Sequence, residues 1–244
     1  KQRLKYNPYY LFFDKQEGSN VWLDGKKMIM LSSNDYLGLS NHPRIIEAGI
    51  QALKTWGSST TGARLSNGSR SYHIKLEEEL ADFLNMESCQ VLSAGYLACM
   101  SSVQSFAKKD DLILVDRNIH SSLWSGILLT QARVERFSHN NFKELQEILN
   151  TEDPNQPKFL IIEGIYSMEG HIAPIPDLIK AVENQNCVII VDDAHGFGVL
   201  GNQGRGTVDH FNCTDKVDII AGSFSKALSS IGGFVAGSKS MIEY

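Results

Sequence analysis

The sequence of 244 residues is 42% hydrophobic and 21% charged, the composition of an ordinary globular protein with one sizeable α/β core or two small domains. A formal net charge of -5 supplies no positive field for a polyanion, so we expect neither nucleic acid nor an anionic membrane surface as the main partner. Because no stretch approaches a membrane span of about 18 apolar residues, and the four cysteines are widely spaced without a CxxC pair, we expect a cytoplasmic protein without a disulfide framework or zinc site.

Two helices are predicted on either side of a polar loop in the first third of the chain. Residues 42–56 place isoleucine and leucine at helical spacing around Pro43, a residue that often opens helices. Residues 73–84 repeat the helical pattern. The loop at 57–71 is rich in glycine, serine, threonine and asparagine, which makes it a candidate binding segment.

From residue 88 onward, short apolar runs alternate with helical stretches, which is typical of β-α-β units. Strands are predicted at residues 89–92, 112–115, 133–137, 159–163, 188–192, 219–221 and 234–236. The run at 188–191 is apolar at successive positions, as in parallel strands covered on both faces. The sequence therefore predicts an α/β fold with a mostly parallel sheet flanked by helices. Ligands bind such sheets beyond the carboxyl ends of the strands, where this chain carries several polar residues.

One lysine follows the strand predicted at 219–221. Lys226 lies in a run of small residues shortly before a pair of glycines. A surface lysine is usually a solvated charge, but small neighbours let a planar ring approach the backbone, and Ser223 and Ser225 can donate hydrogen bonds to a phosphate. A partly desolvated lysine amine can also form a Schiff base. Lys226 is therefore a candidate for holding an aldehyde cofactor such as pyridoxal phosphate (PLP).

An acid pair and a histidine end the strand at 188–192. Asp192 and Asp193 could hold a metal, although no second cluster of ligands with suitable spacing follows them. If Lys226 holds PLP, the Asp192 carboxylate keeps the pyridine nitrogen protonated, so that the ring can accept electrons from a carbanion. His195 could then hydrogen-bond the phenolic oxygen of the ring or the Asp192 carboxylate.

Two further motifs each allow two interpretations. Residues 196–201 have the GxGxxG spacing of dinucleotide-binding loops, but they follow an acidic strand end and the loop continues through Gly204 and Gly206. We interpret them as a turn, with a nicotinamide cofactor as the alternative. His120, after a strand and near a helix start, is either structural or stacked on a cofactor ring. Residues 93–96 offer backbone amides at a predicted helix N-terminus, a natural phosphate site.

Together and in this order, the motifs resemble the α-oxoamine synthase family of fold-type I PLP enzymes, over nearly the whole chain. The resemblance is carried by Ser32–Leu39, Thr61–Arg64, His73 with Leu76 and Glu77, Gly95–Tyr96, Asp116–His120, Glu163–Gly170, Asp192–His195 and Ser223–Lys226. It implies a PLP-binding large domain at residues 41–244 after an N-terminal segment at residues 1–40. It also implies a C-terminal small domain that this chain does not contain.

The family's catalytic roles carry over at matching positions. Lys226 resembles the lysine that forms the Schiff base with PLP, and Asp192 resembles the partner of the pyridine nitrogen. His120 is similar to the residue stacked on the ring, and His195 to the partner of the ring oxygen. Once the substrate has displaced it from the cofactor, Lys226 is expected to take the substrate α-proton as a general base.

The resemblance also implies contacts to phosphate, cofactor and substrate: Gly95, Tyr96 and Ser223 at the phosphate, Ser167 beside the cofactor, and Asn34 and Glu163 at the reaction site. Some family members use an early arginine for the substrate carboxylate. None is identified here, and Pro8, Tyr9 and Tyr10 stand in that region.

The family reaction condenses a small amino acid with an acyl-CoA, loses carbon dioxide and leaves an α-amino ketone. The resemblance thus implies PLP as cofactor, an amino acid and an acyl-CoA as substrates, and a homodimer. The leading expectation is an activity of the 8-amino-7-oxononanoate synthase type, with serine palmitoyltransferase as the alternative. A non-catalytic fragment or partner subunit is the alternative from another class. Retention of Lys226, Asp192 and His120 argues against it, since nothing structural demands that trio.

Overall fold

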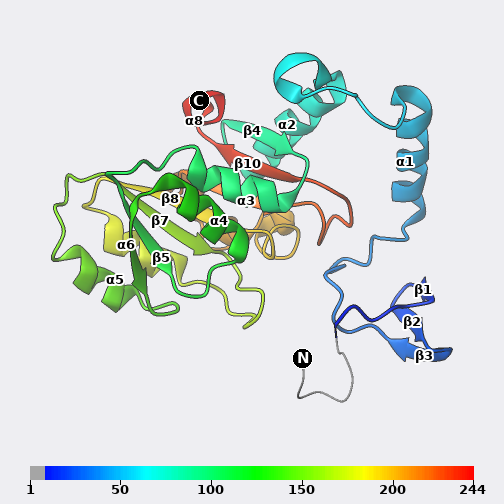
Figure 1. Cartoon of the computed structure of the whole chain (residues 1–244), viewed down its shortest axis with the longest axis horizontal. Helices are drawn as coiled ribbons and strands as arrows, with labels where there is room; N and C mark the ends of the chain where they lie inside the picture. Colours follow the sequence, from blue (N-terminus) through cyan, green and yellow to red (C-terminus); the bar gives the residue numbers. More distant parts are fainter. Residues whose placement is uncertain (1–8) are drawn as a thin grey trace.

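A seven-stranded sheet, in the order β4-β10-β9-β8-β7-β5-β6, forms the centre of the computed structural model (Figure 1). The structure describes residues 9–244, so that Pro8 and the residues before it lie outside the described part. Neighbouring strands from β9 to β6 are parallel, whereas β10 runs antiparallel to both β4 and β9. The mostly parallel sheet predicted from the sequence is therefore confirmed, with one reversed strand.

All seven predicted strands are present, and no end differs by more than two residues from the prediction. They are β4 (Ser88–Leu92), β5 (Leu112–Asp116), β6 (Arg133–Phe137), β7 (Lys158–Glu163), β8 (Cys187–Asp192), β9 (Ile219–Ser223) and β10 (Gly233–Gly237). Strands β5, β7, β9 and β10 are buried along their whole length, which explains their continuous apolar runs. The ends of β9 and β10 were underestimated because glycine and serine favour strands weakly.

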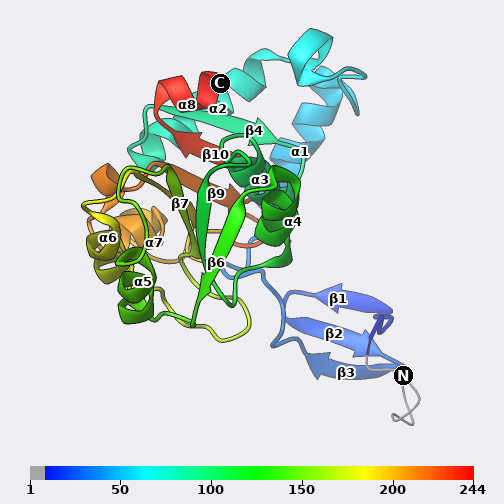
Figure 2. The ribbon, with the colours of Figure 1, turned by 60° about the vertical axis from the view of Figure 1, so that its left-hand side comes forward.

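Helices cover both faces of this sheet. They are α2 (Ser71–Leu84), α3 (Gly95–Gln104), α4 (Ser121–Thr130), α5 (Phe142–Leu149), α6 (Ile175–Val182), α7 (Thr207–His210) and α8 (Lys239–Glu243). Helices α3 and α4 pack together on one side, and α5 and α6 pack together on the other (Figure 2). Within residues 9–244, no helix has the length and apolar character needed to cross a membrane.

The glycine-rich stretch at 196–201 forms turns, as predicted. It leads into two short 3₁₀ turns, η2 (Asn202–Gly204) and η3 (Thr214–Lys216), on either side of α7. Gly198 has φ +82° and Gly201 has φ +78°, backbone conformations that glycine adopts readily. The helix that Gly201 caps is only the three-residue 3₁₀ turn η2, and the next α-helix, α7, starts only at Thr207, so the glycines do not open the α-helix of a dinucleotide-binding loop.

The N-terminal part of the chain lies apart from the large sheet (Figures 1 and 2). A small antiparallel sheet is formed by β1 (Lys15–Glu17), β2 (Asn20–Leu23) and β3 (Lys26–Ile29), which was not predicted because these strands are short and largely exposed. The helix predicted at 42–56 is present as α1 (Pro43–Trp56), with His42 as its N-cap, and none of its residues is buried.

The loop between α1 and α2 contains a π-helical turn, η1 (Arg64–Gly68), and an ion pair that fixes it. Nη1 and Nη2 of Arg64 donate to Oε1 and Oε2 of Glu77 in α2 at 2.8 and 3.0 Å. Oε1 of Glu77 also accepts from the backbone amide of Val91 in β4 at 2.8 Å. Two of the family motifs therefore meet in a structural contact that ties this loop and α2 to the edge of the sheet.

We predict that Glu77→Ala lowers the free energy of unfolding by about 2–3 kcal/mol, because it leaves the Arg64 guanidinium and the Val91 amide without their partner. Urea denaturation measures the change. Glu79→Ala is the matched control, since Glu79 makes only an exposed pair with Lys75, and we expect it to stay within about 0.5 kcal/mol of wild type. Equal losses in the two variants would show that the partly buried ion pair contributes nothing specific.

Candidate active site

A cavity of about 340 Å³ opens beyond the carboxyl ends of three neighbouring parallel strands. Glu163 ends β7, Asp192 ends β8 and Ser223 ends β9, and all three line the cavity. This volume lies within the range of roughly 300–1,000 Å³ that is typical of small-molecule sites. The strand-end rule used on the sequence therefore locates the cavity correctly.

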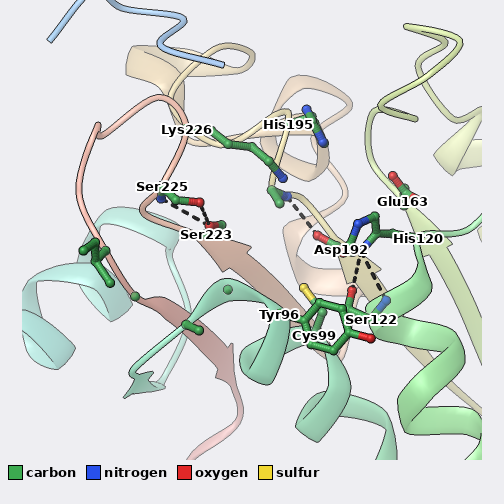
Figure 3. Close-up of a pocket in the computed structure, with 15 residues that line it drawn as sticks. Tyr96, Cys99, His120, Ser122, Glu163, Asp192, His195, Ser223, Ser225 and Lys226 are labelled. Atoms are coloured by element: carbon green, nitrogen blue, oxygen red, sulfur yellow. Dashed lines mark hydrogen bonds between the residues drawn. The ribbon is translucent and has the colours of Figure 1, made fainter. Parts of the chain in front are cut away.

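Lys226 and Asp192 face this same cavity from different elements. Lys226 lies in the turn after β9, and Figure 3 shows its side chain extending toward the space between His195 and Asp192. Asp192 is buried, and its Oδ1 accepts a hydrogen bond from the backbone amide of Ala194 at 3.0 Å. An amine and an oriented carboxylate thus share one pocket, which is the arrangement that the PLP hypothesis requires.

The two carboxylates of the acid pair have separate environments. Asp193 does not line the cavity; its Oδ2 accepts from the backbone amide of Thr207 at 2.7 Å, and its Oδ1 accepts from the Thr207 hydroxyl at 2.6 Å. Burial raises the pKa of Asp193 to about 7. Asp192 lines the cavity whereas both carboxylate oxygens of Asp193 are bonded to Thr207 outside it, so the two carboxylates do not converge on one metal ion. Among residues 9–244, no group of three or more His, Cys, Asp or Glu side chains is arranged to hold a metal.

The N-terminus of α3 meets the end of β9 at one corner of the cavity. A Cβ atom on Gly95 would lie 2.4 Å from Oγ of Ser223, so this approach requires glycine. No side chain caps α3, which leaves the amides of its first turn available. Oγ of Ser223 lies 2.7 Å from Oγ of Ser225. Free amides at a positive helix end beside two hydroxyls suit a phosphate group.

His120 also lines the cavity, where it is held as the N-cap of α4. Its Nδ1 accepts from the backbone amide of Ser122 at 3.2 Å and lies 2.7 Å from the Ser122 hydroxyl. Because Nδ1 accepts, a neutral ring carries its proton on Nε2. The ring lies edge-on to Tyr96, with centroids 6.1 Å apart, and the Tyr96 hydroxyl contacts Oγ of Ser125 at 2.7 Å. His120 therefore combines a capping role with a place in the cavity wall.

Burial and neighbouring charges set the protonation of two cavity side chains. Burial, and then the charge of Asp192, raises the pKa of Glu163 to about 8. Burial, and then the charge of Lys226, lowers the pKa of His195 to about 4. At neutral pH, Glu163 therefore carries a proton and the His195 ring is uncharged.

Eight of the ten predicted site residues line this cavity: Gly95, Tyr96, His120, Glu163, Asp192, His195, Ser223 and Lys226. Asn34 and Ser167 do not line it. Oδ1 of Asn34 contacts the Tyr36 hydroxyl at 3.2 Å, and Ser167 is exposed in the loop after β7. The predicted residues that line the cavity come from the N-termini of α3 and α4 and from the ends of β7, β8 and β9 or the turns after them. Asn34 and Ser167 lie outside the cavity wall.

Several lining residues were missed or left without a role by the sequence reasoning. Cys99 lies one helical turn after Gly95, a spacing that could have revealed it, and burial raises the pKa of its thiol well above the usual value. Ser122 follows His120 at the spacing of a capping contact. Ile231, 86% exposed at the cavity, has no sequence signal.

Comparison with known proteins agrees with this geometry. Residues 26–244 match the family described as aminotransferase class I and II. A putative 8-amino-7-oxononanoate synthase of Trichodesmium erythraeum is 45% identical over 93% of this chain and 58% of its own length. The structure of Sphingomonas wittichii serine palmitoyltransferase superposes with a TM-score of 0.94 at 34% identity, over 98% of this chain and 60% of that one.

A further solved structure similar to this chain is serine palmitoyltransferase from S. paucimobilis with a bound PLP–myriocin aldimine, with a TM-score of 0.94, 30% identity, and coverage of 98% of this chain and 62% of that one. The chain thus spans about three fifths of the length of these relatives. The match over residues 26–244 shows that the chain belongs to the aminotransferase class I and II family, and its relatives place it in the α-oxoamine synthase branch.

Proposed function

We propose that this chain is the cofactor-binding part of a PLP-dependent enzyme that condenses a small amino acid with an acyl-CoA, releases carbon dioxide and leaves an α-amino ketone. The observation that carries the proposal is the placement of Lys226 and Asp192 on one cavity at neighbouring strand ends. Residues 41–244 form the PLP-binding domain in this proposal and residues 1–40 an N-terminal segment. A cytoplasmic location is supported by four cysteines that are all free.

The residues of the cavity fit this cofactor. The amine of Lys226 would condense with its aldehyde group, releasing the aldehyde oxygen as water, and the carboxylate of Asp192 would pair with its pyridine nitrogen. Its phosphate would take the corner that Gly95 leaves open beside Ser223, where any Cβ atom would fill the space. When bound, PLP supplies an electron sink for a substrate carbanion.

The side chains around that ring have complementary tasks. Lys226, once displaced by the substrate amine, is the base that takes the α-proton. The protonated carboxyl of Glu163 adds no negative charge beside a substrate carboxylate and can donate a hydrogen bond to it. We also retain the proposed roles of His120 against the ring face, His195 at the ring oxygen, Ser167 near the cofactor and Asn34 near the substrate.

The 8-amino-7-oxononanoate synthase type of reaction is the first candidate, supported by the higher identity to that relative, and serine palmitoyltransferase is the second. Distinguishing alanine from serine depends on pocket differences worth about 1–3 kcal/mol per group. An assay of CoA release by the full-length protein, with alanine, serine or glycine and acyl-CoAs of several lengths, separates the two. Release with none of these pairs would contradict the proposed condensation.

A homodimer is also proposed, and α1 supports it. This helix has 14 residues and buries none of them, although Ile45, Ile46, Ile50, Leu53 and Trp56 form an apolar face. An isolated helix of this length is marginal in water, so packing must stabilise it. A second copy of the chain is the partner we propose for this face.

We predict that Ile50→Asp converts the dimer of the full-length protein into monomer, because it places a charge in the apolar face of α1. Size-exclusion chromatography with light scattering measures the mass. Gln51→Asp introduces the same charge on the polar side of the helix and should leave the dimer intact. A wild-type monomer, or a dimer retained by Ile50→Asp, would count against this interface.

We predict that the protein supplied with PLP shows a visible absorption band, and that borohydride fixes the cofactor on Lys226. Lys226→Ala should abolish the fixed cofactor, as measured by the mass of the tryptic peptide that contains this position. Lys239→Ala, a variant of an exposed lysine in α8, should label like wild type. Labelling that persists in Lys226→Ala would contradict the assignment of Lys226 as the lysine that holds PLP.

We predict that substitution of Asp192 mainly lowers kcat, whereas substitution of Asp193 mainly lowers the free energy of unfolding. Asp192→Asn should lower kcat by roughly 10²–10³ because a preorganised charge facing the cofactor is lost, with little change in the free energy of unfolding. Asp193→Asn should lower the free energy of unfolding, since Thr207 donates to both carboxylate oxygens and the amide nitrogen that replaces one of them cannot accept, and it should affect kcat less. CoA release and urea denaturation measure the two quantities, and a reversed pattern would refute the division.

A further inference from the structure

Tyr36, in the segment between β3 and α1, contacts a histidine of the cavity 159 positions later in the chain. Its hydroxyl oxygen lies 2.6 Å from Nδ1 of His195, which is short for any hydrogen bond between these groups. The same oxygen lies 3.2 Å from Oδ1 of Asn34. Tyr36, which lies outside the cavity wall, therefore makes the hydrogen bond that holds the His195 ring in that wall.

The Tyr36 hydroxyl has two acceptors within reach. It can donate to Oδ1 of Asn34 at 3.2 Å, beyond the usual O–H···O range of roughly 2.5–3.0 Å, or to Nδ1 of His195 at 2.6 Å, which the shorter distance makes the better acceptor. Burial raises the pKa of Tyr36, which keeps the phenol protonated, and His195 is uncharged at neutral pH. A neutral imidazole has one acceptor and one donor nitrogen, so acceptance at Nδ1 leaves the proton on Nε2.

We infer that Tyr36 is a positioning residue that fixes both the orientation of His195 and its Nε2–H tautomer. Within residues 9–244, Nε2 of His195 has no hydrogen-bond partner, so the ring keeps a free donor beside the cavity. The inference rests on the proposed function, because a bound cofactor supplies the acceptor that this donor would meet. Without Tyr36, the ring would share its proton between both nitrogens and lose one of its restraints.

The segment that carries Tyr36 is itself fixed to the loop of Lys226. Oδ1 of Asp35 accepts from the hydroxyl of Ser229 at 2.5 Å and from the backbone amide of Leu39 at 2.8 Å. Ser229 lies three residues after Lys226, and its amide donates to the Lys226 carbonyl at 2.9 Å. Tyr36 therefore restrains His195, and its neighbour Asp35 restrains the loop that carries Lys226. These contacts give Tyr36 a fixed place from which to act.

The test uses the tautomer of His195, which does not depend on a bound cofactor. In full-length protein with ¹⁵N-labelled histidine, the His195 signals are identified by their loss in His195→Gln. We expect a bare Nδ1 and a protonated Nε2 in wild type, and signals shifted toward tautomer averages in Tyr36→Phe, which removes only the hydroxyl. Tyr72→Phe is the matched control, since Tyr72 is similarly exposed and its hydroxyl makes no hydrogen bond within residues 9–244.

Affinity for PLP provides a second measurement. Tyr36→Phe should raise the Kd for PLP by about 2- to 10-fold, the effect of one neutral hydrogen bond, whereas Tyr72→Phe should not change it. A proton on Nδ1 of His195 in wild type, or identical His195 signals and Kd in Tyr36→Phe, would overturn the inference. Wild-type protein that does not bind PLP would refute the proposed function instead, and the tautomer comparison would still decide the role of Tyr36.

Discussion

The register of three parallel strands is the constraint on which the site depends. In the ladder between β7 and β8, Glu163 is paired with Asp192, and in the ladder between β8 and β9, Asp192 is paired with Ala221, two residues before Ser223. A slip of one residue would turn every side chain of β8 to the other face of the sheet. It would replace Asp192 with Asp193, whose carboxylate is committed to Thr207. The backbone hydrogen bonds of β8 with β7 and β9 thus determine that Asp192, and not Asp193, faces the cavity.

The same register creates an electrostatic problem that burial resolves. Glu163 and Asp192 are neighbours in a buried wall, where two negative charges would repel each other strongly. Burial and the charge of Asp192 raise the pKa of Glu163 to about 8, so one of the two acids keeps its proton. The amine of Lys226 shares the cavity, and the pKa of His195 is lowered first by the burial of its own ring and then by the charge of Lys226. At neutral pH, Glu163 is therefore the neutral member of this pair of acids.

The elements that sequence could predict are those in which one local pattern determines the structure. Continuous apolar runs identified the strands, and the small residues around Lys226 marked the turn that presents it. The separate tasks of Asp192 and Asp193 depend on their neighbours in space, so the sequence left metal binding open. Contacts across long separations leave no periodic signal, which is why the hydrogen bonds of Tyr36 to His195 and of Asp35 to Ser229 had to come from the structure.

Motif residues can also serve the fold rather than the chemistry. Arg64 and Glu77 belong to two of the segments that carry the family resemblance, yet they form an ion pair that ties the loop before α2 to β4. The Asn34–Tyr36 segment serves both the fold and the site. It lies outside the cavity wall, but it contacts two loops that form that wall. This one segment restrains both His195, through Tyr36, and the Lys226 loop, through Asp35. The positions of His195 and of the Lys226 loop are therefore linked. Movement of that segment would displace both groups together, so the N-terminal part of the chain belongs to the organisation of the site.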